Sequence, residues 1–412
     1  MPSSKLSTLS FLPNAISRRS FVQGAAAATV IANTTMAKAF NFGNSSRFVY
    51  LGTYTAGSGN GKGIYLYKAN SFTGDLELVK LVSDTPDPSF LAASASGKFL
   101  YCNNEVSNFQ GTNGSVTSFS VDQQTGDLTL INTVSSVGGG PAFISIDSTG
   151  KYLFVANYGG GSVAVIPIHS DGSLGTAVDS KVDIGNLGPT VATNAPPGSF
   201  AFSGHDAPHC HCIISDHNSK FVLYTDLGQD RIYVNSFDVK TGILTPADTP
   251  FVAIPPGDGP RHLFFHPNNR WLYCITEEAS TLMVFRYNDS NGALSLLQII
   301  SSLPPGFKGT NFDSEVRVSD DGRFLYAANR LHDSISTFAI NFNGELRYIG
   351  EAATRGDYPR QFIIDPTGNF LYSCNQRSDN LTSYRLDPIT GVPKFLNQYD
   401  AAGSPSCIIF LP

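Results

Sequence analysis

Six residues with cationic or titratable side chains are candidates for catalysis or binding. They are His209, His211, Arg261, His262, Arg330 and Arg360. Histidine transfers protons near neutral pH, and arginine binds carboxylates or phosphates through paired N–H donors. The chain as a whole is acidic, with 33 Asp and Glu against 27 Lys and Arg. If the fold gathers these six groups, they form a positive site suited to an anionic small molecule.

All of these residues except His209 fall into two columns when the repeats of the chain are aligned on a Gly/Asn-Lys/Arg turn. One column stands before the turn, where an inner strand starts, and contains His211, Arg261 and Arg360, with His262 and Glu315 one step further on. The other column stands after the turn, where the returning strand ends, and its members include Glu105, Asn157, Tyr158, Glu277, Asn329, Arg330 and Gln376. Because one strand starts and the next ends at the same rim, both columns are expected at one mouth of a channel.

Part of this pattern has a plainer interpretation. Asparagines at strand ends often cap backbone groups, and we favour that role for the asparagines. Arg–Glu pairs between neighbouring repeats can be structural ion pairs. The histidines and arginines are harder to explain in this way, because five or six of them gather in an acidic protein.

Two repeated signals predict the fold. An Asp/Asn-x-x-Thr/Asn-Gly-x-Leu turn occurs seven times, and its copies end at Leu76, Leu128, Leu174, Leu244, Leu294, Leu346 and Val392. An aromatic-Leu-Tyr marker is in phase with it, at Tyr50, Tyr101, Phe154, Tyr224, Tyr273, Tyr326 and Tyr372. Repeats of roughly 40 to 50 residues with several short strands each are typical of a β-propeller. The sequence therefore predicts an all-β fold, a seven-bladed β-propeller.

The two ends of the repeat region are incomplete in complementary ways. The run from Arg47 to Thr53 lacks a strand ahead of it, and Ser404 to Phe410 reads as an opening strand with nothing after it. Pairing of these N- and C-terminal strands would close the ring and remove exposed edges. Residues 40–412 are accordingly expected to form a single domain, in which Gly185 to Ala207 is a long loop on one face.

Residues 1–39 resemble a twin-arginine export signal. Ser17-Arg18-Arg19-Ser20-Phe21-Val22 is followed by a small apolar run from Gly24 to Ala32 and by an Ala37-Lys38-Ala39 cleavage site. The apolar run is too short to span a membrane. A periplasmic or secreted protein is expected. Cleavage leaves 23 basic residues against 33 acidic ones, a net charge of about −10, which disfavours nucleic acid and anionic membrane as partners. We expect a monomer.

The six cysteines raise the question of disulfide bonds and of a metal site. Cys102, Cys274, Cys374 and Cys407 lie in expected strands of different blades, which are usually too far apart to bridge, so buried free thiols are expected. The run from His209 to Cys212 alternates His and Cys. Alternation along a strand places the histidines on one face and the cysteines on the other, so all four cannot bind one ion. We expect the two histidines to face the site and Cys210 and Cys212 to pack between blades. No metal and no other cofactor is expected.

Several segments resemble those of the seven-bladed propeller lactonase family, which includes the bacterial propeller-type 6-phosphogluconolactonases and the fungal carboxymuconate-lactonising enzymes. The segments are Gly52-Thr53-Tyr54-Thr55, Ala156-Asn157-Tyr158, Pro208-His209-Cys210-His211, Asp226-Leu227-Gly228-Gln229-Asp230, Gly259-Pro260-Arg261-His262 and the run from Ser319 to Arg330. The resemblance spans nearly all of residues 47–411. The chain departs from the family at Gly204-His205, where relatives often have Arg-Gln, and at Glu278, where they have leucine.

The resemblance implies hydrolysis of a sugar lactone by activated water. His209 or His211 would be the base, with Glu277 or Glu315 orienting or replacing it. The oxyanion or an anionic substituent would bind Arg261 and Arg330. The substrate contacts would come from Asn157, His262, Glu315, Asn329, Arg360 and Gln376. No Gly-x-Ser-x-Gly elbow occurs, which disfavours a serine nucleophile. Arg261 and His262 should point to opposite faces unless their strand has just begun, so at most one is expected to reach the channel.

Export bears on the choice of substrate. 6-Phosphogluconolactone arises in the cytoplasm, so an exported enzyme is expected to open an unphosphorylated aldonolactone or another external lactone. The expected partner is thus a small anionic or polyhydroxylated lactone. Two alternatives stay open: a carboxymuconate-type cycloisomerase that uses similar arginines, and a non-catalytic propeller that binds partners through loops such as residues 185–207.

Overall fold

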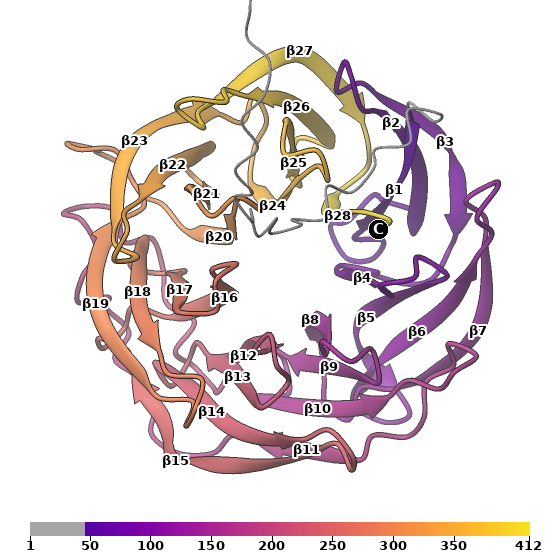
Figure 1. Cartoon of the computed structure of the whole chain (residues 1–412), viewed down its shortest axis with the longest axis horizontal. Coiled ribbons are helices and arrows are strands. Elements are labelled where there is room, and N and C mark those ends of the chain that lie inside the picture. Colours follow the sequence, from indigo (N-terminus) through magenta and orange to yellow (C-terminus); the bar gives the residue numbers. More distant parts are fainter. Residues whose placement is uncertain (1–45) are drawn as a thin grey trace, which may run out of the picture. The chain divides into compact units, whose positions relative to one another are not determined.

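The computed structural model describes residues 46–412, which form 28 strands in seven four-stranded antiparallel sheets. The sheets are the blades of a ring, and in each blade one edge strand lies nearest the centre of the ring (Figure 1). This confirms the predicted seven-bladed propeller. Within the described residues no helix has the length and apolar character needed to cross a membrane. The expected export signal, residues 1–39, lies outside the described residues.

The blades are numbered along the chain, and their strands are given from the centre outward. Blade 1 contains β28 (Pro405–Phe410), β1 (Ser46–Thr53), β2 (Ile64–Asn70) and β3 (Leu76–Ser83). Blade 2 contains β4 (Leu91–Ala93), β5 (Phe99–Phe109), β6 (Asn113–Val121) and β7 (Leu128–Ser135). Blade 3 contains β8 (Pro141–Ile146), β9 (Tyr152–Asn157), β10 (Ser162–Pro167) and β11 (Asp179–Val182).

The other four blades follow the same plan. Blade 4 contains β12 (Cys210–Ser215), β13 (Phe221–Asp226), β14 (Arg231–Asp238) and β15 (Ile243–Ala253). Blade 5 contains β16 (Pro260–Phe265), β17 (Trp271–Thr276), β18 (Thr281–Tyr287) and β19 (Leu294–Ser301). Blade 6 contains β20 (Asp313–Val318), β21 (Phe324–Asn329), β22 (Ser334–Ile340) and β23 (Leu346–Ala353). Blade 7 contains β24 (Pro359–Ile364), β25 (Phe370–Asn375), β26 (Asn380–Leu386) and β27 (Pro393–Ala401).

The last strand of the chain closes the ring. β28 pairs antiparallel with β1, with Val49 opposite Phe410 and Gly52 opposite Cys407. The C-terminal strand thus becomes the innermost strand of the blade that the N-terminal strand begins. The predicted pairing of the two ends is confirmed.

In three places a contact between neighbouring blades links the two sequence signals. The Tyr50 hydroxyl donates to the carbonyl of Gly126 at 2.7 Å, and Tyr326 donates in the same way to Gly391 at 2.9 Å. In each pair the tyrosine marker of one blade binds the glycine turn of the next. Gly391 has a φ of 71°, and a Cβ there would lie 2.6 Å from the Phe324 ring. The turn therefore needs glycine for both its backbone and its close approach.

The six cysteines are buried and free. Cys212 accepts the N–H of Leu263 from the next blade at 3.4 Å. Cys210 contacts Asp183, which follows the outer strand of the preceding blade. The expected packing of thiols between blades is therefore observed for this pair.

Candidate active site

A cavity of about 460 Å³ is lined by residues from all seven blades. Five of the predicted site residues line it: His211, Glu277, Arg330, Arg360 and Gln376. The other lining residues are Tyr54, Ala56, Ser58, Gly59, Glu105, Ala142, Tyr158, Phe202, Tyr358 and Arg377. Apart from Phe202, which lies in the inserted loop, these residues stand near the start of an innermost strand or the end of the next strand, so the cavity is one mouth of the central channel.

Irregular strand starts place the inner column of residues. The strand registers skip Ala142 in β8, His211 in β12, Arg261 in β16 and Arg360 in β24. In β20 they skip Ser314 and Glu315. A bulge inserts an unpaired residue and re-aims its side chain, and bulges are common beside active sites. Strict alternation therefore fails at this rim.

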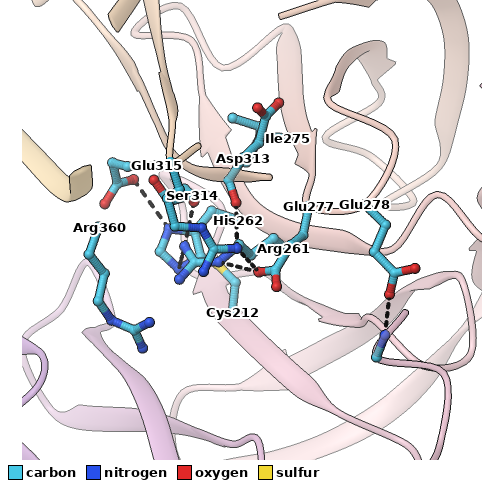
Figure 2. A network of polar contacts seen from close by, with 12 residues as sticks. Cys212, Arg261, His262, Ile275, Glu277, Glu278, Asp313, Ser314, Glu315 and Arg360 are labelled. Atoms are coloured by element: carbon cyan, nitrogen blue, oxygen red, sulfur yellow. Dashed lines mark hydrogen bonds and ion pairs between the residues drawn. The ribbon is translucent and has the colours of Figure 1, made fainter. Parts of the chain in front are cut away.

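The bulge in β16 decides how Arg261 and His262 are arranged. Strand β16 begins at Pro260, so the exception made for a strand that has just begun applies. The two side chains do not point to opposite faces: Arg261 Nη1 lies 3.3 Å from His262 Nε2 (Figure 2). Neither lines the cavity, and both are almost fully buried behind it.

Glu277 joins two arginines. Its Oε2 accepts the Nε–H of Arg261 at 2.8 Å and lies 2.7 Å from Nη2 of Arg330. Burial raises the pKa of Glu277, but Arg330 and Arg261 outweigh this and hold it below its usual range. Burial, and then the charge of Arg330, lower the pKa of Arg261 to about 10. Glu277 is thus ionised, and its contacts orient both guanidinium groups.

A second pair lies beside the first. His262 Nδ1 is 3.3 Å from Glu315 Oε1, and Arg317 Nη2 is 3.7 Å from the other oxygen of Glu315. Burial, and then the charge of Arg261, lower the pKa of His262 to about 4. His262 is therefore neutral at physiological pH.

His211 is the imidazole that lines the cavity. Its ring is 5.0 Å from the His262 ring and 5.5 Å from the Tyr158 ring, edge-on to both. Its Nδ1 is buried without a hydrogen-bond partner within residues 46–412. Burial, and then the charge of Arg261, lower the pKa of His211 well below its usual range. His211 is therefore neutral at physiological pH, which is the form of histidine that can accept a proton.

His209 occupies a different position. Its ring stacks on Tyr158 at 4.1 Å, with Nδ1 2.9 Å from the Tyr158 carbonyl oxygen and Nε2 3.1 Å from Asp206 Oδ1. Both ring nitrogens are engaged, and His209 does not line the cavity. Its contacts hold Tyr158, and Tyr158 does line the cavity.

The two predicted asparagines lie outside the cavity lining. Asn157 donates to the Ser136 carbonyl at 3.0 Å and to Ser162 Oγ at 3.1 Å. Asn329 donates to Ser334 Oγ at 3.1 Å and accepts from Ser302 at 2.9 Å. Both are fully buried. Asn157 thus binds a backbone carbonyl, as the capping interpretation expects, whereas the contacts of Asn329 are to side chains.

Sequence reasoning did not select several lining residues. Tyr54 donates to Glu105 Oε2 at 2.7 Å, and the Arg360 guanidinium lies 5.0 Å from the Tyr54 ring centre. Arg377 lies over the Tyr358 ring at 3.8 Å. Tyr54 belongs to one of the family-like segments, and Glu105 and Tyr158 stand in the returning column. These positions in the sequence could have identified Tyr54, Glu105 and Tyr158 as lining residues.

One buried group could hold a cation elsewhere in the described part of the chain. Ligand atoms of Asp183, Cys210 and Asp226 lie within 4.8 Å of one another, between blades 3 and 4. Tyr224 donates to Asp183 Oδ1 at 2.9 Å, and the Cys210 thiol to Oδ2 at 3.3 Å. Asp226 Oδ2 is buried without a partner within residues 46–412. Burial, and then the Asp226 carboxylate, raise the pKa of Asp183 to about 7, so a proton shared by the two carboxylates accounts for the pair.

Replacing Asp183 with asparagine is expected to stabilise the fold at pH 8 by about 1–3 kcal/mol. The raised pKa of Asp183, about 7, means that the protonated acid contributes stability at low pH. That contribution is lost as pH rises through 7. The amide keeps an N–H donor for Asp226 at every pH, so the gain should shrink at pH 5. Urea unfolding at both values measures it. Destabilisation at pH 8 would show that the charged carboxylate is needed, as in a cation site.

Comparison with known proteins places the chain among characterised relatives. Residues 48–410 match the family model described as lactonase, 7-bladed beta-propeller. A 6-phosphogluconolactonase of Bacillus subtilis is 32% identical over 363 residues, which cover 88% of this chain and 97% of that protein. Another, from Formosa agariphila, is 33% identical, with 85% and 96% covered. The solved structure of a periplasmic gluconolactonase from Pseudomonas aeruginosa has a TM-score of 0.79 at 32% identity, covering 89% of this chain and 99% of its own.

Proposed function

The chain belongs to the seven-bladed β-propeller lactonase family, and we propose that it hydrolyses a sugar lactone in the cavity at the channel mouth. The observation that carries this proposal is the position of His211. A neutral, buried imidazole lines a cavity that Arg330, anchored by Glu277, and Arg360 also line. Ester opening needs a base for water and cationic donors for the oxyanion, and both are supplied there.

The reaction follows from the roles of His211 and Arg330. His211 accepts a proton from a water molecule as the water oxygen adds to the lactone carbonyl. Arg330, held by Glu277, donates N–H groups to the oxyanion that forms. When the tetrahedral intermediate collapses, the bond from the carbonyl carbon to the ring oxygen breaks. The ring oxygen takes the proton from the His211 imidazolium, and a hydroxy acid leaves.

Arg261 and His262 act behind the cavity in this scheme. Arg261 shares Glu277 with Arg330 and donates to the Ser314 carbonyl. His262 contacts Arg261 and Glu315 and lies edge-on to the His211 ring. They fix the orientation of the groups that touch substrate, which matters because small misplacements reduce catalysis strongly.

The cavity suits an acidic or polyhydroxylated substituent at its other side. Arg360 lies 3.7 Å from Glu105, which is longer than a hydrogen bond, and Arg377 is exposed beside it. Gln376 adds an amide that can bind hydroxyls. We assign the substrate's phosphate, or the outer hydroxyls of an unphosphorylated lactone, to this group.

Replacing Arg360 with glutamine is expected to raise KM for a phosphorylated gluconolactone about 10–100-fold, because a charge-assisted contact is lost. The change for the plain lactone should be several-fold smaller. Steady-state kinetics on both lactones measure the difference. Arg385→Gln is the matched control, since Arg385 lies in the same blade and binds the Phe72 carbonyl at the surface. Equal KM changes for both lactones would remove Arg360 from the anion site.

The cellular location bears on which lactone is used. The twin-arginine-like N-terminus supports export, and the Pseudomonas aeruginosa relative is described as periplasmic. We therefore propose an exported enzyme that meets unphosphorylated gluconolactone. A pH-stat assay of the purified full chain, with and without chelator, tests the function. The expected result is acid release from gluconolactone well above the spontaneous rate. A rate equal to the spontaneous one for both plain and phosphorylated lactone would refute the proposal.

A further inference from the structure

We propose that the inserted loop, residues 185–207, determines which lactones the cavity accepts, with Phe202 contacting the apolar face of the substrate ring. The inference rests on the proposed function. It adds a specificity residue that belongs neither to the repeated strands nor to the proton-transfer and arginine groups.

Phe202 reaches the cavity from outside the blades. It lines the cavity, yet 57% of it is exposed to solvent. The edge of its ring packs on Phe312, with ring centres 4.1 Å apart and planes at 84°. Phe312 is buried, and the Arg330 guanidinium lies 5.2 Å from its ring centre. Phe202 therefore stands beside the arginine assigned to the oxyanion, with an uncovered aromatic surface.

The loop is held in place near Phe202. Phe200 forms a parallel bridge with Asn311, and the Asn311 N–H donates to the Ser199 carbonyl at 2.7 Å. Further back, Asn194 donates to Asp258 through its backbone N–H at 3.0 Å and its side chain at 2.8 Å. These anchors fix the backbone on both sides of the insertion's midpoint, so the position of Phe202 is defined.

A buried histidine anchors the end of the loop. His205 lies between two acids, 3.0 Å from Asp230 and 3.1 Å from Glu278. Glu278 also accepts the N–H of Gly204 at 2.6 Å. Although burial lowers it, Asp230 and Glu278 raise the pKa of His205 to about 9. His205 and Glu278, the two places where the chain departs from the family pattern, thus contact each other.

The chemistry of the cavity indicates what Phe202 binds. The surrounding side chains are mostly charged or polar: Glu105, Glu277, three arginines and Gln376. A six-membered sugar lactone carries hydroxyls around its rim and C–H groups on its faces. Polar groups fix the orientation of a ligand, while apolar walls cover its apolar surface. Phe202 supplies such a wall, so the favoured substrates are ring lactones with an accessible C–H face.

Replacing Phe202 with alanine is expected to raise KM for gluconolactone about 3–10-fold, in line with the loss of an aromatic contact, while kcat stays within about two-fold. Phe202→Tyr keeps the ring and should keep KM. Phe342→Ala is the control, because Phe342 is 96% exposed on the turn between β22 and β23 and does not line the cavity. An unchanged KM in Phe202→Ala would overturn the proposal.

His205 is tested as a positioning residue by His205→Gln. His205→Gln is expected to raise KM as much as Phe202→Ala does. The double variant should show no further rise, because both changes remove the same contact between Phe202 and the substrate. Additive effects would contradict a shared role. Titration calorimetry with gluconolactam, a ring analogue without the ester bond, separates this inference from the proposed function: weaker lactam binding by Phe202→Ala supports the loop's role even if the wild type releases no acid. Equal binding of the lactam by the wild type and by Phe202→Ala would overturn the proposed role of the loop.

Discussion

Replacing His211 with glutamine should lower kcat for lactone hydrolysis by about 10²–10⁴-fold, the range expected for loss of a general base. The melting temperature should change little, because the amide fits the space and His211 carries no charge to leave unpaired. His211 lines the cavity and its pKa is depressed by burial and by Arg261. Initial rates by pH-stat, corrected for spontaneous hydrolysis, measure the loss.

His209→Gln is the matched control for this change. His209 lies two residues away, but its ring nitrogens face the Tyr158 carbonyl and Asp206 outside the cavity. Its replacement should cost less than about ten-fold. The pH profile of kcat/KM gives a second check: the acid limb should fall below the ordinary histidine value of about 6.5. A larger loss in His209→Gln than in His211→Gln would reverse the assignment.

Replacing Arg330 with glutamine should lower kcat by about 10²–10³-fold, as expected when an oxyanion donor is removed. KM should change far less than kcat, because the interaction strengthens as the oxyanion forms. Glu277 keeps Arg261 as a partner at 2.8 Å, so the variant should fold. Steady-state kinetics and a melting curve together measure these effects.

The control for Arg330 lies in the same blade. Arg323 precedes β21 on the opposite rim and pairs with Asp321 at 2.7 Å in an exposed position. Arg323→Gln should leave kcat and KM unchanged. Arg330→Gln with wild-type kcat and a raised KM would instead make Arg330 a substrate clamp.

Most of the fold could be predicted because the repeats encode contacts between neighbouring blades. In three places the tyrosine marker binds the glycine turn of the next blade, as Tyr50 binds Gly126. The incomplete repeats at the two ends predicted the β28–β1 pairing, because each end lacks a strand that the other end supplies. Alignment of repeats then predicted the columns that bring His211, Glu277 and Arg330 to one cavity.

What the sequence could not supply is local geometry at the rim. The bulge at Arg261 places it beside His262, and a period of two along a strand does not reveal such an insertion. The position of His211 rather than His209 in the cavity depends on the similar bulge in β12. Phe202 lies in an insertion without repeat partners, so alignment gives no position for it. The Asp183–Asp226 pair joins separate blades and has no local signal.

The most direct test of the account is a crystal structure of the full chain carrying His211→Gln, soaked with gluconolactone. We predict density for the lactone or its aldonate in the cavity, with an oxygen of its carbonyl or carboxylate at hydrogen-bond distance from Arg330 and, where the lactone is intact, its ring against Phe202. Density at the opposite rim, or between blades away from His211, would contradict the claim that this channel mouth opens the lactone.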